Sequence, residues 1–229
     1  MQLVVLAGGL GTRLRGAIPD GLPKPMAPIA GKPFLEHFLD RAIAQGVNRI
    51  HLLVGYAAET ISGHFGSTYC GVPVTYSFEY VPLGTGGALK AASSELVEEF
   101  IFANGDTFVE VTFDDLLALL DTNWLAMSLA PVEDAARYGS VLTSDDVVVG
   151  FQEKGHVGAG LVNAGVYACR REMLDLLPDR QTFSFEADFL QPSLQLLRPP
   201  FQLVESGLLD IGTPESYGLA SALFGDQSA

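Results

Sequence analysis

The sequence predicts an α/β fold in which a mostly parallel sheet is flanked by helices, with a second half that is richer in strands. Two observations carry this prediction. Short apolar runs alternate with segments of helical periodicity over residues 1–130, which is the pattern of repeated β-α-β units. Glycine-rich segments at residues 8–11 and 84–87 come after two of the predicted strands, and glycine allows the backbone conformations that such connections need.

The strands of the first half are predicted from their apolar residues. Residues 3–6 form a continuous apolar run, which is typical of a strand buried on both faces of a parallel sheet. Similar runs predict further strands at residues 49–54, 72–78, 100–103 and 124–130.

Helices are expected between these strands. Residues 33–45 place apolar side chains at helical intervals, with Pro33 in the first turn and Gly46 as the C-terminal cap. Further helices are expected at residues 57–65, 88–96 and 113–120.

The second half mixes strands with helices. Strands are expected at residues 141–142, 147–152 and 161–168, and helices at residues 172–177, 186–197 and 214–224. Thr213 and Pro214 suit the N-cap and the first position of the last helix. Because no linker rich in proline, serine or glycine separates the halves, we expect a single domain over residues 1–225.

The composition of the chain indicates which kinds of partner it can bind and in which cellular compartment it occurs. The chain has 229 residues and a formal net charge of −14, which leaves no room for the basic patch that duplex nucleic acid requires. Its two cysteines form no metal-binding or disulfide pattern, as expected in a reducing compartment. Without a signal peptide or an apolar run of membrane-spanning length, we expect a cytoplasmic protein with neither a nucleic-acid nor a membrane partner.

The glycine-rich segment at residues 7–15 reads Ala-Gly-Gly-Leu-Gly-Thr-Arg-Leu-Arg. Glycines directly after a strand let backbone N–H groups approach phosphates. Two familiar phosphate-binding patterns do not fit: a dinucleotide fingerprint starting at Gly9 would need glycine at Leu14, and a P-loop would need lysine at Ala17. Ten residues after Leu14, Lys24 is one of only four lysines and lies between two prolines, which fix the backbone around its charge.

These two segments, followed by Pro-Ile-Ala-Gly-Lys-Pro at residues 28–33, resemble the signature of the sugar nucleotidyltransferases. Leu-Gly-Thr-Gly-Gly-Ala at residues 83–88, Asn-Gly-Asp at 104–106 and Asp-Ile-Gly-Thr-Pro-Glu at 210–215 continue the resemblance in the expected order. It implies a Rossmann-like, GT-A-like nucleotidyltransferase fold, with a nucleotide-binding half at residues 1–130 and a β-rich, sugar-binding half at residues 131–225. At residues 16–22 the sequence departs from longer family members, so no roles are carried over there.

The resemblance also implies roles for individual residues. Arg13 and Lys24 would be the catalytic residues, and Asp106 and Asp210 would hold Mg²⁺ as the cofactor. Residues that would bind the nucleotide are Leu6, Ala7, Gly8, Gly9, Gly11, Thr12, Gly84, Thr85 and Gly86. Residues that would bind the sugar phosphate are Glu153, Lys154, Asn163 and Gly139.

The resemblance implies transfer of a nucleotidyl group from a nucleoside triphosphate to a sugar 1-phosphate, with release of pyrophosphate. The sequences of these motifs most resemble those of guanylyltransferases that act on a heptose 1-phosphate, so GTP is expected as the nucleotide. The backbone groups of residues 8–9 and 84–87 are expected to recognise guanine by hydrogen bonds. Mannose 1-phosphate guanylyltransferases, short uridylyl- or thymidylyltransferases and a non-catalytic nucleotide-sugar-binding regulator stay open as alternatives. A homodimer is possible.

Overall fold

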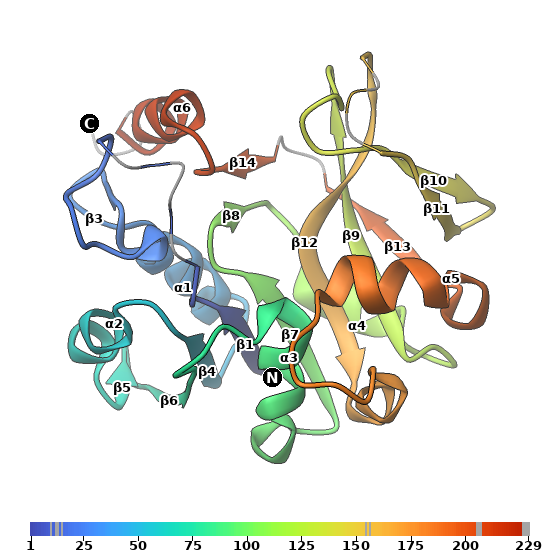
Figure 1. Ribbon diagram of the computed structural model, residues 1–229, viewed down its shortest axis with the longest axis horizontal. Helices are drawn as coiled ribbons and strands as arrows, with labels where there is room; N and C mark the ends of the chain where they lie inside the picture. Colours follow the sequence, from blue (N-terminus) through green and yellow to red (C-terminus); the bar gives the residue numbers. More distant parts are fainter. Residues whose placement is uncertain are drawn as a thin grey trace.

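The computed structural model describes residues 1–9, 11, 14, 16–153, 155, 157–204 and 208–225. Its centre is an eight-stranded sheet with the order β13-β9-β12-β7-β1-β4-β6-β5 (Figure 1). The strands β7, β1, β4 and β6 run parallel, and β12 is antiparallel to both of its neighbours. In chain order these strands are β1 (Gln2–Leu6), β4 (Arg49–Val54), β5 (Thr68–Tyr69), β6 (Val72–Phe78), β7 (Glu99–Asn104), β9 (Leu125–Val132), β12 (Gly160–Arg170) and β13 (Phe201–Leu203).

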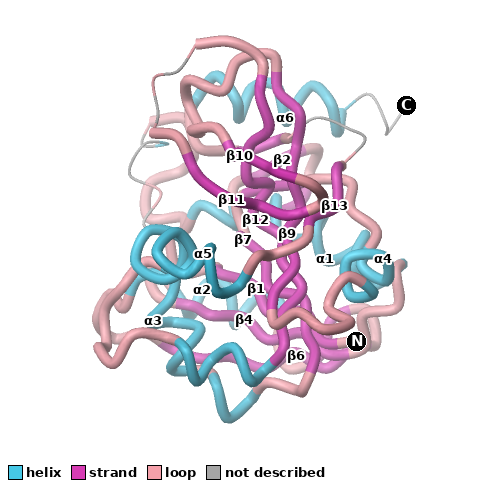
Figure 2. The backbone as a smooth tube through the Cα atoms, turned by 90° about the vertical axis from the view of Figure 1, so that its right-hand side faces the viewer, coloured by secondary structure: helices cyan, strands magenta, loops and turns pink. Residues whose placement is uncertain are grey.

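Helices cover both faces of this sheet (Figure 2). One core lies between the sheet and α1 (Phe34–Ala44), α2 (Ala58–Phe65) and α4 (Phe113–Ala118). A second core lies under α3 (Gly84–Ala91) and α5 (Gln191–Leu197). The expected α/β class, with its mostly parallel sheet between helices, is therefore confirmed.

The two cores explain why the central strands are apolar throughout. In β1, Leu3 and Val5 belong to the first core, whereas Val4 belongs to the second. Successive side chains of a strand point to opposite faces of the sheet, so a strand between two layers of helices buries every residue. The side chains of all three residues are fully buried.

Several helices differ from the expectations. The helix expected at residues 88–96 begins earlier, since α3 spans Gly84–Ala91 and a short 3-10 turn follows at Ser93–Glu95. The helix expected at residues 172–177 is a 3-10 helix at Arg171–Leu176. The helix expected at residues 186–197 is divided into a π-helix at Phe185–Leu190 and α5.

Three short ribbons and a last helix complete the fold. The ribbons pair β2 (Pro28–Ile29) with β3 (Lys32–Pro33), β8 (Thr107–Phe108) with β14 (Leu209–Asp210), and β10 (Val141–Ser144) with β11 (Val147–Phe151). The helix α6 (Pro214–Gly225) begins as expected, because Thr213 Oγ1 accepts a hydrogen bond from Ser216 N–H at 3.3 Å. In the described part of the chain, no helix is long and apolar enough to cross a membrane.

The last helix, α6, packs against residues from the first part of the chain. Phe224 and Ala220 of α6 share a small apolar cluster with Ile29 and Phe34, and Tyr217 Oη donates a hydrogen bond to a backbone oxygen of β2. The ribbon of β8 and β14 lies between α6 and the main sheet (Figure 1). Distant parts of the sequence therefore meet next to the ends of the central strands.

Candidate active site

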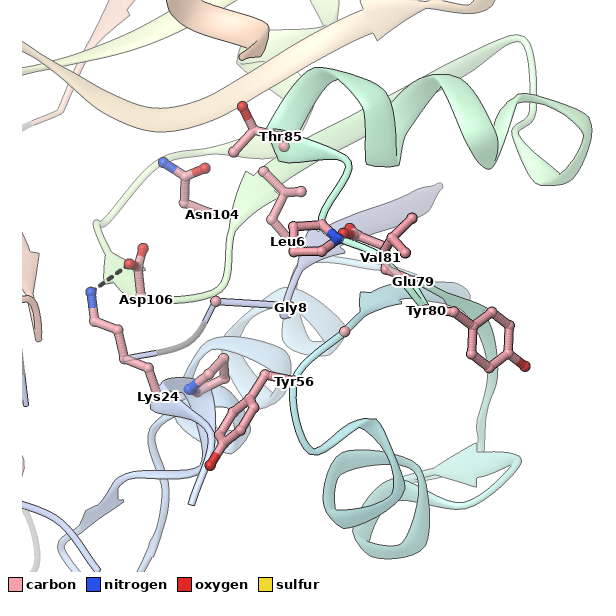
Figure 3. A pocket seen from close by; sticks show the side chains of 15 residues that line it. Leu6, Gly8, Lys24, Tyr56, Glu79, Tyr80, Val81, Thr85, Asn104 and Asp106 are labelled. Carbon is pink, nitrogen blue, oxygen red and sulfur yellow. Dashed lines mark hydrogen bonds and ion pairs between the residues drawn. The ribbon is translucent and has the colours of Figure 1, made fainter. Parts of the chain in front are cut away.

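A cavity of about 580 Å³ lies at the carboxyl ends of the parallel strands (Figure 3). Open α/β sheets bind ligands at this edge. Four strands contribute to the cavity through the residues at or just after their ends. The lining residues are Leu6, Gly8, Gly9, Lys24, Pro25, Gly55, Tyr56, Glu79, Tyr80, Val81, Pro82, Gly84, Thr85, Asn104 and Asp106.

Lys24 and Asp106 form an ion pair at one end of this cavity (Figure 3). Lys24 lies in a single 3-10 turn, Lys24–Met26, which the flanking prolines favour because they fix the backbone angle φ. Its Nζ lies 2.5 Å from Asp106 Oδ2, and the two side chains are 10% and 40% exposed. The structure thus holds a largely buried cation, which a phosphate group could pair with, next to a more accessible carboxylate.

The first glycine-rich segment approaches the same cavity. Gly8 and Gly9 line it, and Gly8 packs so closely against Gly55 that a Cβ on Gly8 would lie 3.1 Å from the nitrogen of Gly55. Gly11 has a φ of +58° and lies against the side chain of Lys24.

The remaining predicted residues of this segment are placed differently or not described. Leu6 lines the cavity, whereas Ala7 is fully buried and is not among the described lining residues. The predictions for Thr12 and Arg13 fall outside the described residues.

The second glycine-rich segment forms the first turn of α3 and not a free loop. Gly84 and Thr85 line the cavity, but the N–H groups of Gly86 and Gly87 donate to Phe183 O at 3.0 and 3.3 Å. A Cβ on Gly86 would lie 2.2 Å from the Phe183 ring. The glycines at 86 and 87 therefore allow close packing against the segment before the π-helix, and Gly86 is not among the described lining residues.

The backbone segments of Asp210 and Asp106 are neighbours in space, but the side chain of Asp210 is hydrogen-bonded to other residues. In the ribbon of β8 and β14, the N–H of Ile211 donates to Asp106 O at 3.1 Å. The carboxylate of Asp210 accepts hydrogen bonds from Arg137 at 2.8 Å, Tyr138 Oη at 2.6 Å and Gly212 N–H at 2.5 Å. Burial, together with this bond to Asp210, raises the pKa of Tyr138 to about 12.

These two carboxylates suit Mg²⁺ in their chemistry, because the ion prefers oxygen ligands. Asp106 presents its carboxylate to the cavity. The side chain of Asp210 is 13% exposed and engaged by Arg137, and within the described part of the chain its Oδ2 accepts only the bond from Tyr138, so this oxygen keeps a lone pair that a metal ion could use. Among the described residues, no group of three or more His, Cys, Asp or Glu side chains forms a metal site of its own.

The residues predicted to bind the sugar phosphate lie on the β-rich half. Asn163 is in β12, where its Nδ2 donates to Tyr167 Oη at 2.6 Å and to Glu186 Oε1 at 2.8 Å. Gly139 precedes β10 with a φ of +83°, and Glu153 is exposed after β11. Lys154 is outside the described residues. Asn163, Gly139 and Glu153 are not among the described lining residues of the large cavity.

Several site residues were given no role from the sequence, although Asn104 belongs to the Asn-Gly-Asp motif noted there. Glu79 and Tyr56 line the cavity soon after β6 and β4, and Asn104 ends β7. Their position at the carboxyl ends of predicted parallel strands is a signal that could have found them. Arg137 and Tyr138 lie in a loop whose contact with Asp210 no local pattern indicates.

A doubly covered parallel sheet, with a glycine-lined cavity at its carboxyl edge and a buried lysine beside a carboxylate, defines a nucleotide-binding α/β protein. The model of the family described as nucleotidyl transferase matches residues 2–227. The chain belongs to this family, which confirms the resemblance.

Individual relatives are similar over nearly the whole chain. A D-glycero-α-D-manno-heptose 1-phosphate guanylyltransferase from Aneurinibacillus thermoaerophilus is 38% identical over 225 residues, covering 95% of each chain. The enzyme of the same name from Campylobacter jejuni is 38% identical over 218 residues, covering 95% of this chain and 97% of the relative. The crystal structure of HddC from Yersinia pseudotuberculosis complexed with GMP-PN has a TM-score of 0.87 and 36% identity, covering 97% of this chain and 99% of that one.

Proposed function

We propose that this protein transfers a guanylyl group from GTP to a heptose 1-phosphate, giving a GDP-heptose and pyrophosphate. The observation that carries the proposal is the buried Lys24 beside Asp106, at one end of a cavity whose length crosses the ends of four parallel strands. The similarity to heptose 1-phosphate guanylyltransferases over 95% of the chain supports the choice of base and sugar.

The reaction forms one bond and breaks one bond. An oxygen of the sugar phosphate attacks the α-phosphorus of GTP, and the bond from that phosphorus to the bridging oxygen breaks as pyrophosphate leaves with the electron pair. The attacking phosphate is already ionised near neutral pH, so no side chain has to act as a general base. The protein contributes positioning and charge neutralisation.

Lys24 is the described residue best suited to neutralise phosphate charge. Its Nζ is buried at the cavity, and a pre-positioned cation in a poorly hydrated site stabilises developing negative charge strongly. Arg13 is proposed to hold the leaving pyrophosphate, because its planar guanidinium can bridge two phosphate oxygens. Lys154, with Glu153, Gly139 and Asn163, is proposed to bind the sugar phosphate.

Asp106 and Asp210 are proposed to hold Mg²⁺, which, when bound, supplies positive charge to the phosphate oxygens. From the described residues, the carboxylate of Asp106 accepts one hydrogen bond on each oxygen, from Lys24 and from Thr107, which leaves lone pairs for the ion; a Mg²⁺ ion there would compete with Lys24 for the carboxylate and favour pairing of Lys24 with a phosphate. For Asp210 the acceptor site left on Oδ2 beside the bond from Tyr138 would take the ion, while Arg137 stays on Oδ1.

The remaining proposals concern the context of the reaction. We place the protein in the cytoplasm, because nucleoside triphosphates are the substrates, with neither nucleic acid nor membrane as partner. The chain is proposed to act as a single domain of two halves, residues 1–130 and 131–225, and to be able to form a homodimer.

The test is a pyrophosphate-release screen of five nucleoside triphosphates (GTP, ATP, UTP, CTP and dTTP) against a panel of sugar 1-phosphates. The expected result is fastest turnover with GTP and a heptose 1-phosphate, and no turnover in EDTA. Fastest turnover with mannose 1-phosphate would favour the other guanylyltransferase activity, and turnover of UTP or dTTP as fast as GTP would reject guanine as the base. Tight nucleotide-sugar binding without turnover of any pair would favour a regulator.

A further inference from the structure

Thr85, in the first turn of α3, links two parts of the protein that are far apart in the sequence. It lies on the wall of the large cavity (Figure 3), and its Oγ1 accepts a hydrogen bond from Phe185 N–H at 2.8 Å. Phe185 is the first residue of the π-helix, and the first N–H groups of a helix have no partner within it. The hydroxyl of Thr85 therefore caps a helix that begins 100 positions further along the chain.

The segment that precedes the π-helix is also bonded to α3 through its backbone. Phe183 O accepts from the N–H groups of Gly86 and Gly87, and Phe183 N–H donates to Leu83 O at 3.0 Å. A Cβ on Gly86 would overlap the Phe183 ring, so the glycine permits this close approach. The start of the π-helix is therefore held in one position beside the first turn of α3, and the bond from Thr85 completes the attachment.

The next residue of the π-helix, Glu186, holds the side chain of Asn163, which is proposed to bind the sugar phosphate. Glu186 Oε1 accepts hydrogen bonds from Asn163 Nδ2 at 2.8 Å and from the buried Tyr167 Oη at 2.8 Å. At the other end of the amide, Asn163 Oδ1 accepts from Gly165 N–H at 3.0 Å. The orientation of Asn163 therefore depends on where the π-helix places Glu186.

The bond from Thr85 acts one residue away from the carboxylate that holds Asn163. Phe185 and Glu186 are the first two residues of the π-helix. Helix ends fray, and a helix that loses a capping oxygen is less stable in its first turn. Loss of the Thr85 acceptor would therefore disturb Glu186, and through it Asn163, while the backbone bonds of the neighbouring segment remain.

We propose that Thr85 is a positioning residue for the sugar 1-phosphate. By capping the π-helix it holds Glu186, and through Glu186 it holds Asn163 in the orientation that binds the sugar phosphate. This inference rests on the proposed function, in which Asn163 contacts the second substrate. It connects Thr85 with the sugar 1-phosphate, whereas the resemblance to the family connects it with the nucleotide.

The test measures KM for both substrates in Thr85→Val, which keeps the shape of the side chain but removes the acceptor. The substrates are the triphosphate and the sugar 1-phosphate that the wild type turns over fastest. KM for the sugar 1-phosphate should rise by roughly tenfold or more, because Phe185 N–H loses its partner. KM for the triphosphate should stay within about threefold of the wild type. Thr85→Ser keeps the hydroxyl, so its KM for the sugar 1-phosphate should return to within about threefold of the wild type.

A double-mutant cycle with Asn163→Ala tests whether the effect passes through Asn163. If it does, adding Thr85→Val to Asn163→Ala should raise KM for the sugar 1-phosphate by less than about threefold, because residues that act through one contact are not additive. Thr60→Val is the matched control, since Thr60 is an exposed residue of α2 outside the described lining of the cavity, and it should leave both KM values unchanged. If Thr85→Val does not fold, as judged by its melting temperature, Thr85→Ala takes its place with the same expected results.

The outcomes separate this inference from the proposed function. A folded Thr85 variant without the hydroxyl that raises only KM for the triphosphate, or neither KM value, would overturn the positioning role. A rise in KM for the sugar 1-phosphate that multiplies with the effect of Asn163→Ala would also overturn it. In these cases turnover of GTP and a heptose 1-phosphate by the wild type would leave the proposed function standing. A wild-type protein that turns over no sugar 1-phosphate with any triphosphate would overturn both.

Discussion

Gly105 tests whether the geometry of the cavity floor controls activity. It is buried between Asn104 and Asp106, and its N–H donates to Leu6 O at 2.9 Å. A Cβ added at this position would lie 2.5 Å from Leu6 O and 3.1 Å from Val5 Cγ1. Because carbon–oxygen contacts are normally about 3.3 Å or longer, the backbone after β7 would have to move by on the order of 1 Å in Gly105→Ala.

Such crowding should affect both stability and turnover. Overpacking of this kind costs about 1–3 kcal/mol, and each kcal/mol lowers the melting temperature of a chain of this size by about 2–4 °C. The displacement passes directly to Asp106, and a misplacement of about 1 Å can reduce kcat/KM by about 10²-fold. Thermal unfolding and pyrophosphate release, measured on the same preparation, report the two effects.

Gly63→Ala provides the control for this experiment. Gly63 lies in α2, and a Cβ there would meet nothing within 4 Å, so the same substitution should stabilise the helix by about 0.5–1 kcal/mol without a change in turnover. If Gly105→Ala matched Gly63→Ala in melting temperature and kept kcat/KM within threefold of the wild type, the contact with Leu6 would not constrain the site.

Three further predictions concern charge. Asp106→Asn should abolish turnover yet bind GTP more tightly than the wild type in EDTA, because Lys24 loses its competing carboxylate; weaker binding by calorimetry would contradict this. Asp210→Asn should lose more than about tenfold in kcat, and its combination with Asp106→Asn should be little worse than either alone, so losses that multiply would reject a shared metal ion. Burial lowers the pKa of His51, so denaturant unfolding should show stability falling as pH drops below about 6.5, with a smaller slope in His51→Gln; equal slopes would assign the effect elsewhere.

The strands could be predicted from sequence because each is a local feature. The runs at residues 49–54 and 72–78 match β4 and β6 at both ends. Burial on two faces requires apolar residues along β4, whereas β6 alternates buried and exposed residues at its start, which is the pattern of a strand buried on one face. The sequence did not predict β14, which is two residues long and pairs Leu209 with Phe108 and Asp210 with Thr107, far apart in the sequence. Its formation depends on tertiary contacts and leaves no periodicity to detect.

The structural role of the glycine-rich segments was hard to predict from the sequence. Residues 8–9 and 84–87 look alike as glycine-rich segments after strands, yet they serve different purposes. Gly8 brings two chain segments together at the cavity, whereas Gly87 would place a Cβ 2.2 Å from Gln181 O. The residue that requires a glycine is a tertiary neighbour about 100 positions away, which no local pattern contains.

The ion pair of Lys24 and Asp106 is better explained by ligand binding than by stability. Among the described residues, Lys24 is the only lysine, arginine or carboxylate that is buried, and a buried ion pair often contributes less than an apolar pair of the same volume. In a chain of net charge −14, the long-range field repels a nucleoside triphosphate. A lysine that is already desolvated and fixed by its 3-10 turn loses little further hydration when a phosphate replaces Asp106. The desolvation free energy of the Lys24 charge is therefore part of the free energy of folding and does not weaken nucleotide binding.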